Sequence, residues 1–145
     1  MNRMRLHLVL GAGDMHLLEP ALRGGVDVVQ LREKELADDD LVAAAEPFRA
    51  ACGRHGALFI LNDRPDLVEA CGVHVGRSDA PVAEARALVG PERIVGVSAS
   101  TVAELADVEG ADYVGVTAFA TPTKEDAVPG GLELVRDAAA ALTVP

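Results

Sequence analysis

The chain has 145 residues, half of them are apolar, and its formal net charge is −10. A chain of this length and composition has room for one domain with a substantial core, so we expect residues 1–145 to form a single domain. The acidic balance argues against nucleic acid or an anionic membrane as the main partner, because both bind a basic face. The sequence shows no signal-peptide pattern and no run of the ~20 apolar residues that a membrane span requires, so we expect a cytoplasmic protein.

Short apolar or β-branched runs alternate with helical patterns along the chain. Strands are predicted at 6–10, 26–31, 57–61, 73–75, 93–97 and 112–116, and helices at 15–23, 39–54, 64–70, 81–88, 101–108 and 132–141. Every gap between strands leaves room for a helix, which indicates parallel strands joined by crossovers. Thr101 with Glu104 forms a capping-box pattern, and Pro81 suits a first helical turn. The segments 24–27 and 110–112 each predict a helix end followed by a strand.

Six βα units leave two architectures, an open doubly wound sheet or a (β/α)8 barrel. The turn at 11–14 reads Gly-Ala-Gly-Asp and does not complete the GxGxxG pattern of a dinucleotide-binding sheet. Complete barrels have about 200 residues or more, and residues 143–145 read as the beginning of a seventh strand. The barrel interpretation leaves the edges of the first and sixth strands unpaired, so we expect a homo-oligomer.

Polar side chains follow five of the predicted strands. They are Gln30, Arg32, Glu33, Lys34 and Glu35; Asn62, Asp63 and Arg64; Arg77, Ser78 and Asp79; Ser98 and Ser100; and Thr121, Thr123 and Lys124. The carboxyl ends of parallel strands open onto one face, where the active sites of such folds lie. We therefore expect these groups to converge on one mouth.

The converging groups suit the binding of a metal-bound diphosphate. Asp63 and Asp79 supply two carboxylates, and Mg2+ commonly binds through one or two carboxylates together with phosphate oxygens and water. Arg32, Lys34 and Lys124 supply cations for the same phosphate oxygens. Gln30 and Asn62 could bind the edge of a polar heterocycle.

Each group also has a purely structural interpretation. The run from Gln30 to Lys34 could be the polar end of a strand, and Ser98 could bond to the backbone there. Asn62 and Asp79 could each begin a helix as an N-cap. Residues 121–124 could form a plain exposed loop. These alternatives weaken together, because every group occupies the equivalent position in its βα unit.

The cysteines and histidines give no sign of a nucleophilic dyad. Cys52 and Cys71 form no CxxC pair, so we expect both thiols to be reduced and mostly buried. His7 and His74 fall within predicted strands, and a structural role is the favoured interpretation of His74.

The ordered motifs closely resemble the thiamine-phosphate synthase family. They are Val-Gln-Leu-Arg-Glu-Lys at 29–34, Leu-Asn-Asp-Arg at 61–64, Gly-Val-His-Val-Gly at 72–76 with Asp79, Gly-Val-Ser at 96–98, Gly-Ala-Asp-Tyr-Val-Gly at 110–115 and Thr-Pro-Thr-Lys at 121–124. The resemblance extends over about residues 6–136, and six motifs in order at similar spacing are far more specific than one.

The resemblance implies a (β/α)8 barrel with about six units in this chain. It implies an enzyme that joins a hydroxymethylpyrimidine diphosphate to a thiazole phosphate and releases diphosphate. By resemblance, the pyrimidine diphosphate would contact Gln30, Arg32, Lys34, Asn62, Ser98 and Lys124, of which Arg32, Lys34 and Lys124 are the candidate catalytic groups. Asp63 and Asp79 would hold Mg2+, and Thr121 and Thr123 would contact the thiazole phosphate.

Four features depart from the family pattern and concern mainly the thiazole half of the site. The chain stops before the seventh and eighth strands, the usual Thr-His at 99–100 reads Ala-Ser, the run at 117–120 is one residue short, and the loop at 11–14 differs. Two alternatives therefore stand beside the synthase. One is a truncated homologue that is inactive or only binds diphosphate; the other is a relative of the thiazole tautomerase, which uses a histidine that Ser100 replaces.

Overall fold

The computed structural model describes residues 4–67, 70–120 and 128–145. Its six strands are β1 (His7–Leu10), β2 (Val28–Leu31), β3 (Leu58–Asn62), β4 (Gly72–Val75), β5 (Ile94–Ala99) and β6 (Tyr113–Val116). They form one parallel sheet whose spatial order is the chain order, β1-β2-β3-β4-β5-β6. A doubly wound sheet reverses its strand order, whereas a barrel does not. The structure therefore confirms the barrel-type α/β fold.

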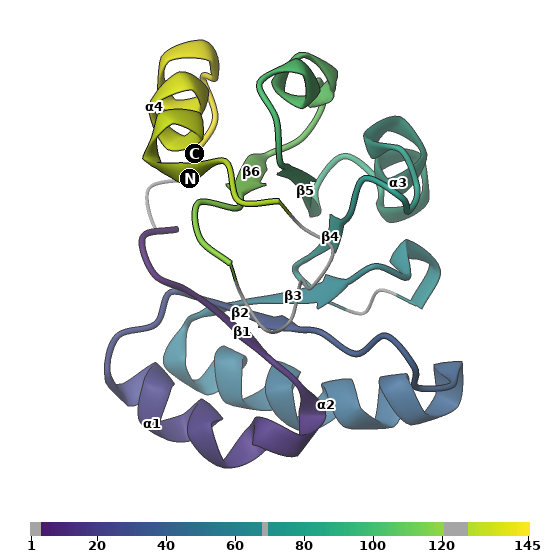
Figure 1. Ribbon diagram of the computed structural model, residues 1–145. Coiled ribbons are helices and arrows are strands. Elements are labelled where there is room, and N and C mark those ends of the chain that lie inside the picture. Colours follow the sequence, from purple (N-terminus) through teal and green to yellow (C-terminus); the bar gives the residue numbers. More distant parts are fainter. Residues whose placement is uncertain (1–3, 68–69, 121–127) are drawn as a thin grey trace.

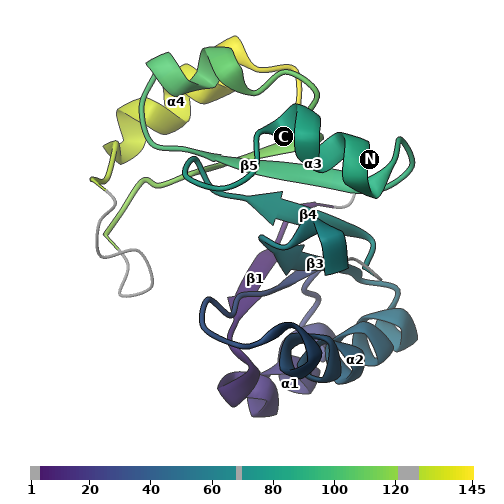
Figure 2. The same ribbon diagram turned by 90° about the vertical axis from the view of Figure 1, so that its right-hand side faces the viewer.

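The sheet curls so that its two halves face each other across an interior (Figure 1). The helices α1 (Leu18–Arg23) and α2 (Asp38–His55) cover the outer side of β1–β3, and α3 (Val82–Val89) and α4 (Gly131–Ala141) cover the outer side of β4–β6. Figure 2 shows the same arrangement from the side, with the helices on the outside of both halves. Among the described residues, no helix is long and apolar enough to cross a membrane.

Two predicted helices are short 3-10 turns, and a third begins as one. The 3-10 helices are η1 (Ala12–Leu17), η2 (Pro65–Leu67) and η3 (Ala103–Asp107). The prediction of a helix at 64–70 was wrong for the described part, because Asp63 and Arg64 both have positive φ and β4 already begins at Gly72. The predicted helix at 101–108 is limited to η3, whose backbone stays in the tighter 3-10 form. The helix predicted from residue 15 becomes α-helical only at Leu18.

The predicted pattern of a helix end followed by a strand is confirmed before β2 and before β6, and it has a clear structural role. Gly25 and Gly110 both have positive φ, at +99° and +86°, which suits glycine at a helix end. The carboxylate of Asp27 then accepts the backbone N–H of Leu6 at 3.2 Å, and that of Asp112 accepts the backbone N–H of Val95 at 2.8 Å. Each aspartate thus fixes the start of the neighbouring strand.

The core lies between the outer face of the sheet and the helices. Phe48 of α2 is fully buried and packs with Phe59 of β3, the two ring centroids lying 6.4 Å apart. Ala85 of α3 is fully buried in a second cluster with Val73 and Val95. Because side chains alternate along a strand, the residues between these outward-facing ones point into the interior of the curled sheet.

The ends of the chain agree only partly with expectation. The backbone N–H of Val114 in β6 donates to the carbonyl of Pro145 at 2.9 Å, so the segment after α4 returns to the edge of β6. Residues 143–145 form no regular strand, although this hydrogen bond lies at the edge of β6, where the predicted seventh strand would begin. Cys52 is buried as predicted, whereas Cys71 is exposed, because it lies in the connection just before β4.

Candidate active site

A cavity of about 800 Å³ lies inside the curled sheet and opens at the carboxyl ends of the strands. Ten of the polar residues that the sequence predicted to converge line it: Gln30, Arg32, Lys34, Asn62, Asp63, Arg77, Ser78, Asp79, Ser98 and Ser100. The predicted Thr121, Thr123 and Lys124 lie outside the described residues. Residues from β2, β3, β4 and β5 and from the loops after them therefore converge on one mouth, as the strand-end pattern indicated.

The carboxylates of Asp63 and Asp79 lie side by side, within hydrogen-bonding contact. Asp63 follows the last residue of β3 with a φ of +54°, a conformation that is rare for a residue with a side chain and that is typical of functional sites. The Asn62 amide donates to Asp63 Oδ2 at 2.7 Å, and the Gly76 N–H donates to Asp79 Oδ2 at 2.8 Å. A Cβ at residue 76 would lie 2.4 Å from that same oxygen, so glycine permits the close approach.

The electrostatics of this pair favour a bound cation. Burial and the neighbouring Asp79 raise the pKa of Asp63 to about 6, while the Gly76 N–H and the charge of Lys34 act in the opposite direction. Two carboxylates in contact either share a proton, so that the pair carries one negative charge, or need a cation between them to be charged together. Mg2+ needs no more than one or two protein carboxylates when a phosphate supplies further oxygens. This low requirement for protein ligands is relevant here, because the described residues contain no cluster of three or more metal-binding side chains.

Cationic side chains line the same cavity as the carboxylate pair. Arg32 and Lys34 follow β2 and line the cavity, Arg32 partly buried and Lys34 exposed. Arg77 also lines it, and its guanidinium lies 3.4 Å from the carboxylate of Asp107. Arg77 belongs to the polar residues after β4 that were predicted to converge here, and the structure confirms its place in the cavity. Positive charge is thus concentrated at the mouth of a chain that is acidic overall.

The structure disagrees with two of the structural alternatives. Asp79 does not cap α3, because the N-cap residue is Pro81, which makes no side-chain cap bond, and Asp79 bonds to Gly76 instead. The hydroxyl of Ser98 contacts the side chain of His74 at 2.9 Å and is not confined to backbone bonding. Glu33, in contrast, turns away from the cavity and accepts the N–H of Ala12 at 2.5 Å, a structural role.

Sequence reasoning missed a group of buried polar side chains deeper in the cavity. His74 Nδ1 lies 2.9 Å from the Tyr113 hydroxyl, and Tyr113 is also hydrogen-bonded to Gln30. The ring of His7 meets the edge of Tyr113 at a centroid distance of 5.5 Å, and burial lowers the pKa of His7. The signal in the sequence is the chain's single tyrosine, which falls within a predicted strand. Its partner across β5 and β6, Gly96, is identified only by the strand register of the structure.

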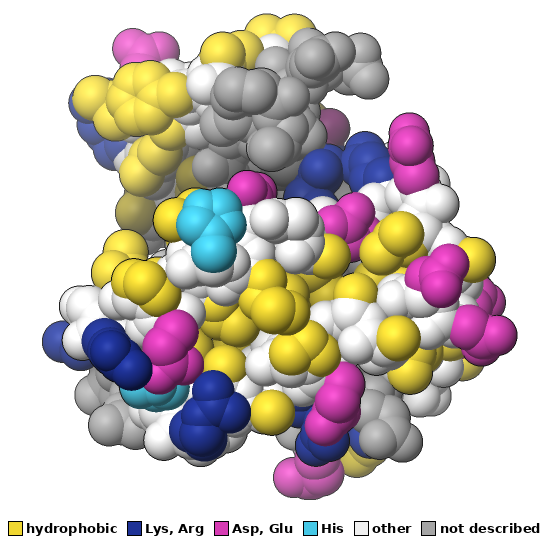
Figure 3. Space-filling view, turned by 90° about the horizontal axis from the view of Figure 1, so that it is seen from below, with side chains coloured by type: hydrophobic (Ala, Val, Ile, Leu, Met, Phe, Trp, Pro, Cys, Tyr) yellow, Lys and Arg dark blue, Asp and Glu magenta, His cyan; other side chains and the backbone are white. Residues whose placement is uncertain are grey.

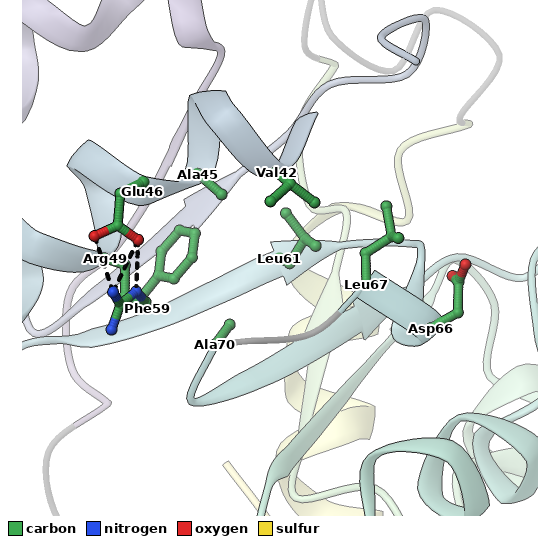
Figure 4. A pocket seen from close by; sticks show the side chains of 9 residues that line it. All are labelled: Val42, Ala45, Glu46, Arg49, Phe59, Leu61, Asp66, Leu67 and Ala70. Atoms are coloured by element: carbon green, nitrogen blue, oxygen red, sulfur yellow. Dashed lines mark hydrogen bonds and ion pairs between the residues drawn. The ribbon is translucent and has the colours of Figure 1, made fainter. Parts of the chain in front are cut away.

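A second hollow of about 400 Å³ lies on the outer face of the sheet, between α2, β3 and η2 (Figure 4). Val42, Phe59, Leu61 and Leu67 make its lining largely apolar, and Glu46 and Arg49 pair at its rim at 2.8 Å. Among the described residues that line it, the one cation is Arg49, which is paired with Glu46. On the face seen from below, basic and acidic side chains are interspersed and form no single basic patch (Figure 3).

Comparisons with known proteins show the family that the whole chain resembles. A family model described as thiamine monophosphate synthase matches residues 6–145. A thiamine-phosphate synthase of Moorella thermoacetica is 48% identical over 94% of this chain and 69% of its own length. One from Nostoc sp. is 42% identical over 100% of this chain and 44% of its own length, so the chain spans less than half of that relative.

The fold has a close match among solved structures. The thiamine phosphate pyrophosphorylase from Pyrococcus furiosus superposes with a TM-score of 0.88 at 28% sequence identity. The match covers 99% of this chain and 73% of that protein. A citrate synthase, at 14% identity and a TM-score of 0.57, shares the fold alone.

Proposed function

This chain belongs to the thiamine monophosphate synthase family, a family of transferases in thiamine biosynthesis, and from that premise we propose that it catalyses the family reaction. In that reaction 4-amino-2-methyl-5-(diphosphooxymethyl)pyrimidine combines with a thiazole phosphate to give thiamine phosphate and diphosphate. The observation that carries the proposal is the convergence of Arg32, Lys34 and the Asp63–Asp79 pair on one cavity. Small molecules are accordingly the proposed partners, and a homo-oligomer stays a prediction.

The residues present fit Mg2+ as the cofactor. The adjacent carboxylates of Asp63 and Asp79 are hard oxygen ligands that need a cation to be charged together. When bound, Mg2+ neutralises negative charge on the departing diphosphate. The backbone of Gly76 and the amide of Asn62 would hold the two carboxylates in place for that purpose.

The remaining residues of the cavity would bind and stabilise the leaving group. Arg32 can bind phosphate oxygens with two parallel N–H donors, and Lys34 adds a point charge beside Asp63. Ser98 would donate from the opposite wall, and Lys124 would add a further cation by resemblance. Departure of diphosphate before the thiazole attacks requires its charge to be neutralised and requires no protein nucleophile. The pyrimidine itself stabilises the cation that forms.

The test is turnover with both substrates, with and without added Mg2+. We expect thiamine phosphate only when Mg2+ is present and expect Asp63→Ala to abolish it. The matched control is Asp66→Asn, an exposed aspartate three residues along that lines the outer hollow, which should leave turnover unchanged. Binding of diphosphate and Mg2+ without turnover would support the diphosphate-binding homologue instead. Turnover of a thiazole carboxylate phosphate alone would support the tautomerase relative.

A further inference from the structure

A continuous chain of hydrogen bonds crosses the interior of the sheet beneath the candidate site. It joins Gln30 of β2, Tyr113 of β6, His74 of β4 and Ser98 of β5. All four side chains are buried, with exposed fractions of 4%, 6%, 7% and 8% in that order. Buried polar groups are costly unless they are paired, so a connected chain across four strands is a specific arrangement.

The direction of the donors along this chain follows from its members. Burial keeps the Tyr113 phenol protonated by raising its pKa, whereas the Gln30 amide acts the other way because it donates an N–H to the phenolic oxygen. The phenol proton is then available to His74 Nδ1, 2.9 Å away. With Nδ1 as the acceptor, the neutral imidazole carries its hydrogen on Nε2 and donates it to Ser98 Oγ, also at 2.9 Å.

We propose that this chain holds His74 in the Nε2–H tautomer and thereby turns the hydroxyl proton of Ser98 away from His74, toward a phosphate oxygen in the cavity. His74 and Tyr113 are then positioning residues, and Ser98 is the group that touches the ligand. The inference rests on the proposed function, because it identifies the Ser98 hydroxyl as the donor that the departing diphosphate would meet on the β5 side of the cavity. A serine hydroxyl can donate or accept, and the histidine removes that ambiguity.

The packing around the two rings supports a fixed orientation. A Cβ at residue 96 would lie 2.0 Å from the Tyr113 ring, so only glycine leaves room for the ring across β5. A Cβ at residue 115 would lie 3.3 Å from His74 Cε1, which is tight contact on the imidazole edge. On its far side, the Tyr113 ring meets His7 at an interplanar angle of 62°. The rings therefore have little freedom to exchange partners.

The tautomer can be measured without any turnover. Nitrogen-15 NMR of the imidazoles in the full chain, with His74 assigned from a His74→Gln variant, should show Nε2 protonated and Nδ1 bare at neutral pH. Tyr113→Phe removes the donor to Nδ1 and should populate the other tautomer. A wild-type His74 with its hydrogen on Nδ1 would overturn the proposal. This result does not depend on whether the chain is a synthase.

Kinetic measurements on variants provide a second test of the proposal. We expect Ser98→Ala to lower kcat about 100-fold, as the loss of a donor to developing negative charge does. Tyr113→Phe should lower kcat about tenfold with a smaller change in KM. The double variant should be no slower than Ser98→Ala alone, because both changes remove the same donor. Multiplied losses in the double variant would mean that Tyr113 acts only through packing and would overturn the proposal.

If the proposed function is wrong, these experiments give a different set of results. A wild-type chain that forms no thiamine phosphate contradicts the synthase assignment, and the binding of inorganic diphosphate with Mg2+ by calorimetry then replaces kcat as the readout. In that experiment, too, the losses in Ser98→Ala and Tyr113→Phe should not multiply. Thermal melts of each variant check that the chain is folded before either comparison is made.

Discussion

Aspartates at the two ends of the strands have opposite environments. At the amino ends, Asp27 and Asp112 accept backbone N–H groups, and the guanidinium of Arg86 donates to Asp112 at 2.5 Å. At the carboxyl ends, Asp63 and Asp79 lie against each other, and the pKa of Asp63 is raised to about 6. The same residue type thus stabilises the fold at one end and stores electrostatic repulsion at the other.

The difference shows which end of the sheet is adapted to a ligand. Pairing opposite charges stabilises a fold. Two carboxylates in contact with no cation between them are therefore expected where a bound ligand or metal ion supplies the positive charge. The positive φ of Asp63 and Arg64 adds backbone strain at the same place. Stability and function are therefore separated along the strand direction, and substitutions can test each end in turn.

The largest expected effect is at the carboxyl end. Asp63→Asn should lower turnover about 100-fold or more, because it removes a proposed ligand of Mg2+. The same variant should raise the free energy of unfolding at pH 7 by about 1 kcal/mol, since the repulsion from Asp79 disappears and asparagine tolerates positive φ better. Turnover and urea unfolding measure the two effects. A less stable Asp63→Asn protein would contradict the idea that this pair is strained.

The next largest effect is expected at the amino ends of the strands, where a substitution should lower stability and leave turnover unchanged. Asp112→Ala leaves Arg86 and the Val95 N–H without their carboxylate, and we expect a loss of about 2 kcal/mol in the free energy of unfolding. Turnover per folded molecule should stay unchanged. Asp107→Ala is the control, because its pair with Arg77 is exposed and should contribute under about 0.5 kcal/mol. Equal losses in the two variants would contradict a special role for Asp112.

A smaller effect should follow from crowding the proposed metal site. Gly76→Ala introduces a Cβ into the space held by Asp79 Oδ2, so we expect Mg2+ affinity, measured by calorimetry, to fall about tenfold. Gly53→Ala in α2 is the matched control, because a Cβ there meets nothing within 4 Å. That variant should gain a few tenths of a kcal/mol from helix propensity, up to about 1 kcal/mol. Unchanged affinity in Gly76→Ala would place Asp79 outside the metal site.

The smallest effect is a pH dependence carried by Asp63. Its pKa is about 6 in the folded chain against 3.8 for the free side chain, so between these values the folded chain binds more protons. Its contribution to the free energy of unfolding therefore falls by the order of 1 kcal/mol as pH rises from 4 to 6. The difference between wild type and Asp63→Asn in metal-free buffer isolates this term. A difference that does not change over this range would contradict the raised pKa.

The sequence by itself determined the alternation of six strands with helical segments and the residues that follow each strand. Both depend on local signals, namely apolar periodicity, glycine at helix ends and chain order, and all six strands were predicted to within about two residues at each end. The convergence of Gln30, Asn62, Asp63, Asp79 and Ser98 also followed, because parallel strands share one carboxyl end.

Only the tertiary structure decided which side chains touch. The contact between Asp63 and Asp79, and the chain from Tyr113 through His74 to Ser98, depend on strand register and on the curl of the sheet. A strand pattern assigns His74 to a face but does not name its neighbours, since those come from residues 24 and 39 positions away. Likewise, the positive φ of Arg64 excludes this residue from the helix predicted to begin there, and residues 65–67 form the 3-10 turn η2. Local chemistry thus fixed the elements, whereas long-range packing placed the aspartates and the histidine in their particular environments.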